Sequence, residues 1–450
     1  MVKLNDKIQL NIIDVNYEGL GVAKYEDKVV FVEGAITNEL VLAKVDYIHK
    51  NYIRTHAVSI IEKSNDRCEK HCASYPRCGG CQTMHIKYKE GLEYKKKAFK
   101  DTLKRIGHID FDVKNIIGMK NPNGYRNKIQ MPFGKDKKTN EMILGYYAKG
   151  THNVIPFKEC YLQSDNVSNL IQYVYNLLKI NKVSVYDEIT KKGCLRHLLI
   201  RENYKKELML VFITHENRIN NIDVIVKEIL KVNSSVISII QNINDKGTNV
   251  ILGDKSKVLY GKDEIEDKIG EVLYKISHKS FFQVNREQAF NLYNKVLDYI
   301  GDGNSKVIDA YCGVGSISLM LATKCDYVFG IEVVKEAIDD AISNAKLNNL
   351  NNTKFIVGKV EEEIFSILEN EVIDAVVIDP PRKGIDSKVI EALNNSNINR
   401  IVYVSCNPAT LARDLELLGE KYNIDDITLV DMFCYTNGLE SVVKLTKKLI

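Results

Sequence analysis

The feature that most constrains the fold is a change of pattern after about residue 276, where short apolar segments begin to alternate with helical ones. The clearest unit is KVIDAYCGVGSISLMLA, residues 306–322, which predicts a strand, a turn with two glycines and a helix. Regular alternation of strands and helices predicts a doubly wound α/β domain. Such sheets bind ligands in a crevice at the carboxyl ends of their strands, so we expect the main binding site there.

Three carboxylates lie at the ends of predicted strands in this region. Asp309 ends the first strand, Glu332 ends the second, and Asp379 ends a third, DAVVID. Gly313 and Gly315 allow a ligand to approach the backbone, but the full G-x-G-x-x-G pattern of a dinucleotide site is missing. An acid at the end of the second strand can accept both ribose hydroxyls. The set favours S-adenosylmethionine, a cationic ligand with a ribose, and a dinucleotide is the alternative.

A single cysteine also lies at the end of a predicted strand. In VYVSCNPATLARDL, residues 402–415, Cys406 follows an apolar run, and Asn407 and Pro408 end the strand before a helix. Single cysteines on strands are most often small buried hydrophobic residues. The alternative is a nucleophilic thiolate in the crevice, with its pKa lowered from about 8.5 by the N-terminus of the following helix.

A thiolate beside a methyl donor suits methylation of uracil at C5. The C5 atom is a poor nucleophile until a thiolate adds to C6, and a base must later remove the C5 proton before elimination frees the cysteine. Glu440, in DMFCYTNGLESVVKL, is the candidate base because it lies between the two strands of a predicted terminal hairpin. A solvated loop glutamate is the simpler interpretation of its spacing.

Two regions precede this domain. Residues 1–62 contain short strands separated by turns, which predicts a small β-barrel. Residues 63–275 are mixed and strand-rich, with LRHLLIREN and LMLVFITH as paired strands. We therefore predict three domains, at residues 1–62, 63–275 and 276–450.

The central region begins with four of the ten cysteines of the chain. Cys72, Cys78 and Cys81 form a C-x5-C-x2-C pattern, and Cys160 is a distant fourth candidate, whereas Cys68 lies outside the pattern. Four thiolates suit an iron–sulfur cluster and tetrahedral zinc equally well by spacing alone. The C-x3-C-x2-C arrangement of radical chemistry is absent.

Basic residues concentrate at 87–105, KYKEGLEYKKKAFKDTLKR, although the net charge of the chain is only +4. This stripe suits a nucleic-acid backbone, and a solvated helix face is the alternative. No segment has the apolar length of a membrane span, and the N-terminus lacks the apolar core of a secretion signal. We expect a cytoplasmic protein with no membrane contact and no obligate protein partner, in which the cysteines are not disulfide-bonded.

Several motifs occur in an order that resembles the RNA (uracil-5-)-methyltransferase family, which modifies tRNA or 23S ribosomal RNA. They are SFFQVN, DAYCGVG, IEVVKEAI, DPPRKG, YVSCNPATLARD and TNGLES. The segment YEGLGVAKYEDKVVFVEGAITNE is similar to a TRAM domain, an OB-fold-like RNA-binding barrel. The resemblance implies a Rossmann-like S-adenosylmethionine-dependent methyltransferase domain, preceded by a mixed central domain and that barrel.

The resemblance also implies roles for single residues. Cys406 matches the nucleophile, and Glu440 matches the base that removes the C5 proton. Phe281 or Phe282 matches an aromatic platform for a uracil that has left its stack. The residues that match cofactor positions are Gln283, Tyr311, Ser316, Glu332 and Asp379.

The ribosomal-RNA branch of this family carries a 4Fe-4S cluster on the same cysteine pattern. The resemblance therefore favours iron–sulfur over zinc, with Cys72, Cys78, Cys81 and Cys160 as ligands, and it favours 23S ribosomal RNA as the substrate that becomes 5-methyluridine. The same chemistry on tRNA is the first alternative, and a non-catalytic RNA-binding protein is the second. A role in RNA binding would give the basic stripe its phosphate contacts, at Lys95, Lys96, Lys97 and Lys100.

The chain departs from the family pattern at three positions. Asn38 replaces a usual glycine in the TRAM-like segment, Cys434 replaces a proline, and Gly438 replaces a histidine. Gly438 would make the loop before Glu440 more flexible, and a reactive Cys434 would complicate labelling of the nucleophile.

Overall fold

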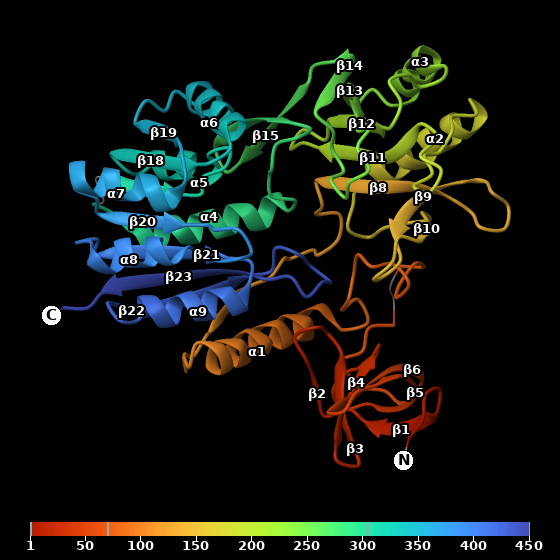
Figure 1. Cartoon of the computed structure of the whole chain (residues 1–450), viewed down its shortest axis with the longest axis horizontal. Helices are drawn as coiled ribbons and strands as arrows, with labels where there is room; N and C mark the ends of the chain where they lie inside the picture. Colours follow the sequence, from red (N-terminus) through yellow and green to blue (C-terminus); the bar gives the residue numbers. More distant parts are fainter. Residues whose placement is uncertain (1, 70–71, 304–305, 450) are drawn as a thin grey trace.

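The computed structural model describes residues 2–69, 72–303 and 306–449. They form a six-stranded N-terminal sheet, a seven-stranded central sheet, a two-stranded hairpin and an eight-stranded C-terminal sheet (Figure 1). Within these ranges, we find no helix that combines the length and the apolar character needed to cross a membrane.

The N-terminal sheet has the strand order β1-β5-β6-β4-β3-β2. In β5, Val41, Ala43 and Val45 are buried in the core of this sheet, because alternate residues of a strand point to one face. Asn38 has a left-handed backbone with φ of 65°, a conformation that asparagine tolerates, so this departure from glycine keeps the turn. The strands are β1 (Lys7–Asn11), β2 (Asp14–Val15), β3 (Gly21–Tyr25), β4 (Lys28–Glu33), β5 (Leu40–Ile48) and β6 (Tyr52–Glu62).

The central sheet has the order β10-β9-β8-β11-β12-β13-β14. The predicted pairing of β11 with β12 is confirmed, and it is antiparallel. The helices α2 and α3 bury apolar faces in one hydrophobic cluster with this sheet. The elements are β8 (Lys128–Lys135), β9 (Met142–Tyr147), β10 (Val154–Pro156), α2 (Asp165–Ile180), β11 (Leu195–Glu202), β12 (Leu208–Thr214), α3 (Ile222–Val232), β13 (Val236–Ile243) and β14 (Lys255–Gly261).

The C-terminal region confirms the predicted α/β fold. Its sheet has the order β19-β18-β17-β20-β21-β23-β22-β7, and the first five of these strands are parallel. Residues of α4 and α5 lie in the hydrophobic cluster on one face, and residues of α7, α8 and α9 lie in the cluster on the other.

The bounds of these elements follow the alternation of the sequence. The hairpin β15 (Glu264–Ile269) and β16 (Val272–Ser277) precedes the domain, and the remaining strands are β17 (Lys306–Ala310), β18 (Tyr327–Glu332), β19 (Thr353–Val357), β20 (Ala375–Ile378), β21 (Arg400–Ser405), β22 (Tyr422–Val430) and β23 (Glu440–Lys447). The helices are α4 (Arg286–Ile300), α5 (Ser316–Ala322), α6 (Lys335–Leu347), α7 (Val360–Asn370), α8 (Ser387–Asn395) and α9 (Pro408–Leu418).

An early part of the chain also packs on the C-terminal sheet. The strand β7 (Asn115–Ile117) pairs in parallel with β22 at the edge, and α1 (Tyr88–Ile106) lies along α9 (Figure 1). Phe99 and Leu103 of α1 are buried in the same cluster as Leu415 of α9. Residues 88–117 fall inside the predicted central domain by sequence, whereas Phe99, Leu103 and Val113 are buried against the C-terminal domain.

Candidate active site

A cavity of about 1640 Å³ lies at the carboxyl ends of the parallel strands. Seven residues predicted from the sequence line it together, although they span much of the C-terminal half of the chain: Gln283, Tyr311, Ser316, Glu332, Asp379, Cys406 and Glu440. The doubly wound topology accounts for this convergence, because parallel strands end at one edge of the sheet.

The turn after β17 exposes its backbone to the cavity on one side. Tyr311, Gly313 and Gly315 all have positive φ angles, of 67°, 55° and 80°. A Cβ atom added to Gly313 would meet no atom within 4 Å, so a ligand can approach this backbone closely. The Gly313 N–H donates to Glu332 Oε2 at 3.2 Å, and the Val334 N–H donates to Oε1 at 2.9 Å. These bonds fix the carboxylate where the sequence predicts a ribose contact.

Two further carboxyl groups line the cavity in a poorly solvated environment. Asp309 is fully buried, its Oδ2 accepts a hydrogen bond from Ser318 Oγ, and its Oδ1 has no hydrogen-bond partner. Burial raises the pKa of Asp309 to about 7, and the neighbouring charge of Asp379 adds to the increase. Burial raises the pKa of Asp379 to about 7 as well. Acids with an unsatisfied oxygen favour a cationic ligand. The donor set therefore fits S-adenosylmethionine.

Cys406 lies in the turn between β21 and α9, and its neighbours fix that turn. Asn407 caps α9, because its side chain accepts from the Ala409 N–H at 3.1 Å. The Asn407 amide group donates to the Arg382 carbonyl at 2.9 Å, and this bond ties the turn to the loop after β20. The predicted strand, cysteine and helix are thus present, and Cys406 lines the cavity.

Glu440 lies beside the cysteine. The antiparallel pairing of β21 with β23 places Ser405 opposite Ser441, so the next residue of one strand and the preceding residue of the other are neighbours. The Ser441 hydroxyl donates to the Ser405 carbonyl at 3.1 Å and supports this register. Glu440 is only 5% exposed, so it is not the solvated loop residue that its spacing alone favours.

The electrostatics of this pair differ from the expectation for the cysteine. Burial raises the pKa of Cys406, and the charges of Glu440 and Asp379 raise it further, whereas Arg382 lowers it. In the ligand-free cleft the pKa of the thiol is thus raised, although the predicted helix follows Cys406. Burial likewise raises the pKa of Glu440 well above its ordinary value. The thiol and the carboxyl group both favour their protonated forms, and a higher pKa makes Glu440 a stronger base once it is ionised.

The two adjacent phenylalanines have different environments. Phe281 is 74% exposed and lines the cavity, whereas Phe282 is 2% exposed and contacts Tyr274 in the core, with ring centroids 5.5 Å apart. Only Phe281 is placed to stack on a base that enters the cavity. Arg382 also lines the cavity, although the sequence analysis did not predict it as a site residue. It directly follows two prolines at the end of a strand, and this position could have identified it.

The four predicted metal ligands lie in one region of the fold. Burial raises the pKa of Cys81, and the charges of Cys160, Cys78 and Cys72 add to the increase. Cys81 and Cys160 also pack against the same small hydrophobic cluster. Within residues 2–69, 72–303 and 306–449, however, no group of three or more histidine, cysteine, aspartate or glutamate side chains is arranged to hold a metal ion. Metal binding by these cysteines stays a prediction.

The lysines of the basic helix α1 differ from their prediction. The Lys95 side chain is only 8% exposed, and its ammonium group forms an ion pair with Asp431. Lys95 therefore cannot serve as the predicted phosphate contact. Each of the other three lysines named for that role has an acidic partner: Lys96 pairs with Glu93, Lys97 with Asp14 and Lys100 with Asp112. Cys434 is fully buried, and burial raises its pKa to about 12, so it is poorly placed to compete with Cys406 for a labelling reagent.

An open α/β sheet with fixed acids at its strand ends and a cavity that suits a sulfonium ligand defines an S-adenosylmethionine-dependent methyltransferase. The family of tRNA (uracil-5-)-methyltransferases matches residues 87–448 of the chain. The chain belongs to this family of RNA-modifying enzymes.

Relatives match over almost the whole length of the chain. An RNA methyltransferase of Clostridium tetani is 41% identical over 449 residues, which cover 99% of this chain and 97% of the relative. One of Bacillus cereus is 42% identical over 451 residues, with 99% and 98% covered. The crystal structure of the Pyrococcus abyssi tRNA (uracil-54, C5)-methyltransferase with S-adenosyl-L-homocysteine is similar, with a TM-score of 0.81 and 28% identity over 97% of this chain and 99% of that one.

Proposed function

We propose that this enzyme methylates uracil C5 in 23S ribosomal RNA to give 5-methyluridine, with Cys406 as the nucleophile and Glu440 as the base. The observation that carries the chemistry is the position of Cys406 and Glu440, which are neighbours at the strand ends and line one cavity with Glu332 and Asp379. The cofactor and the two reacting side chains would therefore share a single cavity.

When bound, S-adenosylmethionine would supply the methyl group; Glu332 would hold its ribose, and Asp309 and Asp379 would attract its positive charge. The Cys406 thiolate adds to uracil C6, which moves electron density onto C5 and its conjugated carbonyl. After C5 has gained the methyl group, the Glu440 carboxylate takes the C5 proton. The electron pair of the C5–H bond re-forms the C5–C6 double bond, and the C6–S bond breaks to return the thiolate.

The target base must leave its RNA stack to reach Cys406, and unstacking costs a few kcal/mol. Phe281 is exposed at the cavity, and stacking of the base on its ring would offset this cost. Stacking on an aromatic ring contributes about 1–3 kcal/mol per base. Arg126 and Lys279 also line the cavity and suit the phosphates on either side of that base.

The assignment to ribosomal RNA depends on the cysteines. Their spacing resembles the iron–sulfur branch of the family, and the charges of Cys72 and Cys78 raise the pKa of both Cys81 and Cys160, which supports a common site. A tRNA substrate is the second candidate, and the similarity to the Pyrococcus abyssi tRNA enzyme favours it. The N-terminal sheet would contribute to RNA binding as a TRAM-like domain in either case.

The test uses S-adenosylmethionine with a radiolabelled methyl group, offered with unmodified 23S ribosomal RNA or with unmodified tRNA. The nucleosides are separated after digestion, and the Cys406→Ala protein is the control. Label in 5-methyluridine from ribosomal RNA alone, absent with the variant, supports the proposal. Label from tRNA alone would transfer the same chemistry to the second candidate. Absence of label from both would favour a non-catalytic RNA-binding protein.

A further inference from the structure

We propose that Lys95 is a positioning residue for Glu440. It holds the loop of residues 431–439, which joins β22 to β23 and leads directly into Glu440. The inference rests on the proposed role of Glu440 as the base, and it extends the site to a helix that the sequence places far from it.

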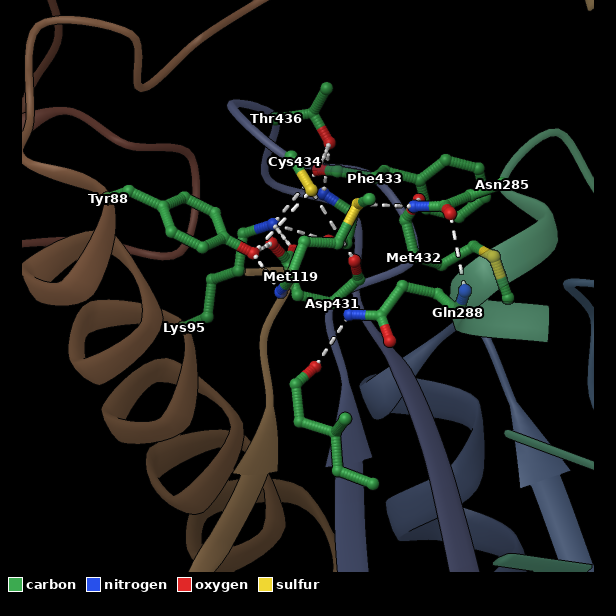
Figure 2. Close-up of polar contacts among 12 residues, drawn as sticks. Tyr88, Lys95, Met119, Asn285, Gln288, Asp431, Met432, Phe433, Cys434 and Thr436 are labelled. Atoms are coloured by element: carbon green, nitrogen blue, oxygen red, sulfur yellow. Dashed lines mark hydrogen bonds and ion pairs between the residues drawn. The ribbon is translucent and has the colours of Figure 1, made fainter. Parts of the chain in front are cut away.

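One ammonium group holds both ends of this loop. The Lys95 Nζ atom donates to Asp431 Oδ1 at 2.5 Å and to the Phe433 carbonyl at 3.1 Å (Figure 2). It also donates to the Gly438 carbonyl at 2.8 Å. A lysine has three N–H donors, so these bonds use its full capacity. The start and the end of the 431–439 loop are therefore fixed to a single atom of α1.

Both carboxylate oxygens of Asp431, the acidic partner, accept a hydrogen bond as well. Asp431 is fully buried, and its Oδ2 accepts a hydrogen bond at 2.6 Å from the hydroxyl of Tyr88, which lies about two turns before Lys95 on α1 (Figure 2). A buried ion pair persists when its partners match closely, and loss of one partner leaves an uncompensated charge. The pair thus specifies one arrangement of the loop.

The contact at Gly438 is the one nearest to the chemistry. Gly438 lies two residues before Glu440, lines the cavity and has the conformational freedom of a glycine. Its carbonyl bond to Lys95 restrains that freedom, and its N–H donates to Thr436 Oγ1 at 3.0 Å. The flexibility expected from a glycine at this position is therefore limited by α1, so the backbone that leads into Glu440 is restrained.

The helix α1 contacts both the element next to the nucleophile and the loop next to the base. Phe99 and Leu103 of α1 pack in one cluster with Leu411 and Leu415 of α9, and α9 begins directly after the turn that carries Cys406. The strand pairing of β21 with β23 makes the two reacting residues neighbours, and an element that contacts both α9 and the 431–439 loop restrains their separation further. Displacement of a reacting group by about 1 Å can lower a rate about 100-fold.

The test follows proton removal separately from methyl transfer. The substrate is RNA with tritium at uracil C5, and the methyl donor carries radiocarbon. In Lys95→Met, we expect methyl transfer in the first turnover to continue, and tritium release to fall about 10- to 100-fold. A covalent RNA–protein adduct that survives denaturing electrophoresis should accumulate. Lys104→Met is the matched control, because Lys104 lies on α1 and forms only an exposed pair with Asp110.

A second variant covers the case in which Lys95→Met does not fold. Lys95→Arg keeps the charge beside Asp431, but its planar guanidinium cannot direct three bonds from one nitrogen. It should fold and show the same separation of the two labels to a smaller degree.

Equal losses of methyl transfer and tritium release, with no adduct, would overturn the positioning role. If wild-type protein methylates neither RNA, the proposed function fails; if Glu440→Gln accumulates adduct while both Lys95 variants do not, only this inference fails.

Discussion

Replacement of Asp309 by asparagine should remove a pH-dependent loss of stability from the ligand-free protein. Asp309 is fully buried, and burial raises its pKa from 3.8 to about 7. The folded protein therefore keeps this proton over a pH range in which the unfolded chain has lost it. Because the folded state binds more protons in that range, the free energy of unfolding falls as the pH rises from about 4 to about 7.

The size of the effect follows from the two pKa values. Between about pH 5 and about pH 8, ionisation of this one group should lower the free energy of unfolding of the wild type by about 2–3 kcal/mol. For a domain as large as the C-terminal one, this loss of free energy corresponds to a fall in melting temperature of about 5–10 °C. The asparagine variant cannot ionise, so its melting temperature should fall by that much less over the same pH range.

The assay is thermal unfolding of ligand-free wild type and Asp309→Asn at both pH values. Ser318→Ala is the control, because it removes the hydrogen bond that lowers the pKa of Asp309 and leaves the carboxyl group in place. Its melting temperature should depend on pH at least as steeply as that of the wild type. If Asp309→Asn changes the melting temperature equally at both pH values, the reasoning from burial is refuted.

Four further predictions concern the proposed chemistry. Glu440→Gln should still transfer the methyl group but lose turnover by about 100- to 10,000-fold, with a covalent RNA adduct on denaturing gels; normal turnover would contradict its role. Because the pKa of Cys406 is raised, kcat/KM should increase as the pH rises from about 6 to about 8, and a flat profile would mean that thiolate formation does not limit the reaction. Phe281→Ala should lower kcat/KM about tenfold with little change in melting temperature, whereas Phe282→Ala should lose about 3–5 kcal/mol of stability; matching effects would place both rings in the core. Protein purified without oxygen should be brown if the four cysteines hold iron–sulfur, and colourless protein that contains zinc would refute that assignment.

Local pattern was sufficient for much of the site. Asp309 and Glu332 lie near the ends of apolar strands, Cys406 follows such a strand, and Asn407 and Pro408 predict the start of α9. These features depend on neighbours in the chain, and strand ends of a parallel sheet converge whatever lies between them. These strand-end residues could therefore be placed at the cavity before the sheet order was known, whereas Gln283, Tyr311 and Ser316 were named only from the resemblance to the family, and local spacing favoured a solvated loop for Glu440.

Other features depended on contacts between distant segments. Phe281 and Phe282 are adjacent and chemically identical, so only the packing of the hairpin β15–β16 against α4 decides which ring is buried. The pKa of Cys406 is raised by burial and by the charges of Glu440 and Asp379, and all three depend on segments that are distant in the sequence. Neither result can be obtained from the nearest neighbours in sequence.

By itself, the sequence determined an α/β domain whose strand ends carry acids and a thiol, because alternating polarity and turn residues act over a few positions. Only the tertiary structure decided that α1 packs on α9, because the buried side chains of Phe99 and Leu103 share a hydrophobic cluster with residues far away in sequence. That packing turns Lys95 inward, to a buried aspartate more than 300 residues away in sequence, instead of outward to RNA. The charge of a side chain is a property of the sequence, whereas its partner is a property of the fold.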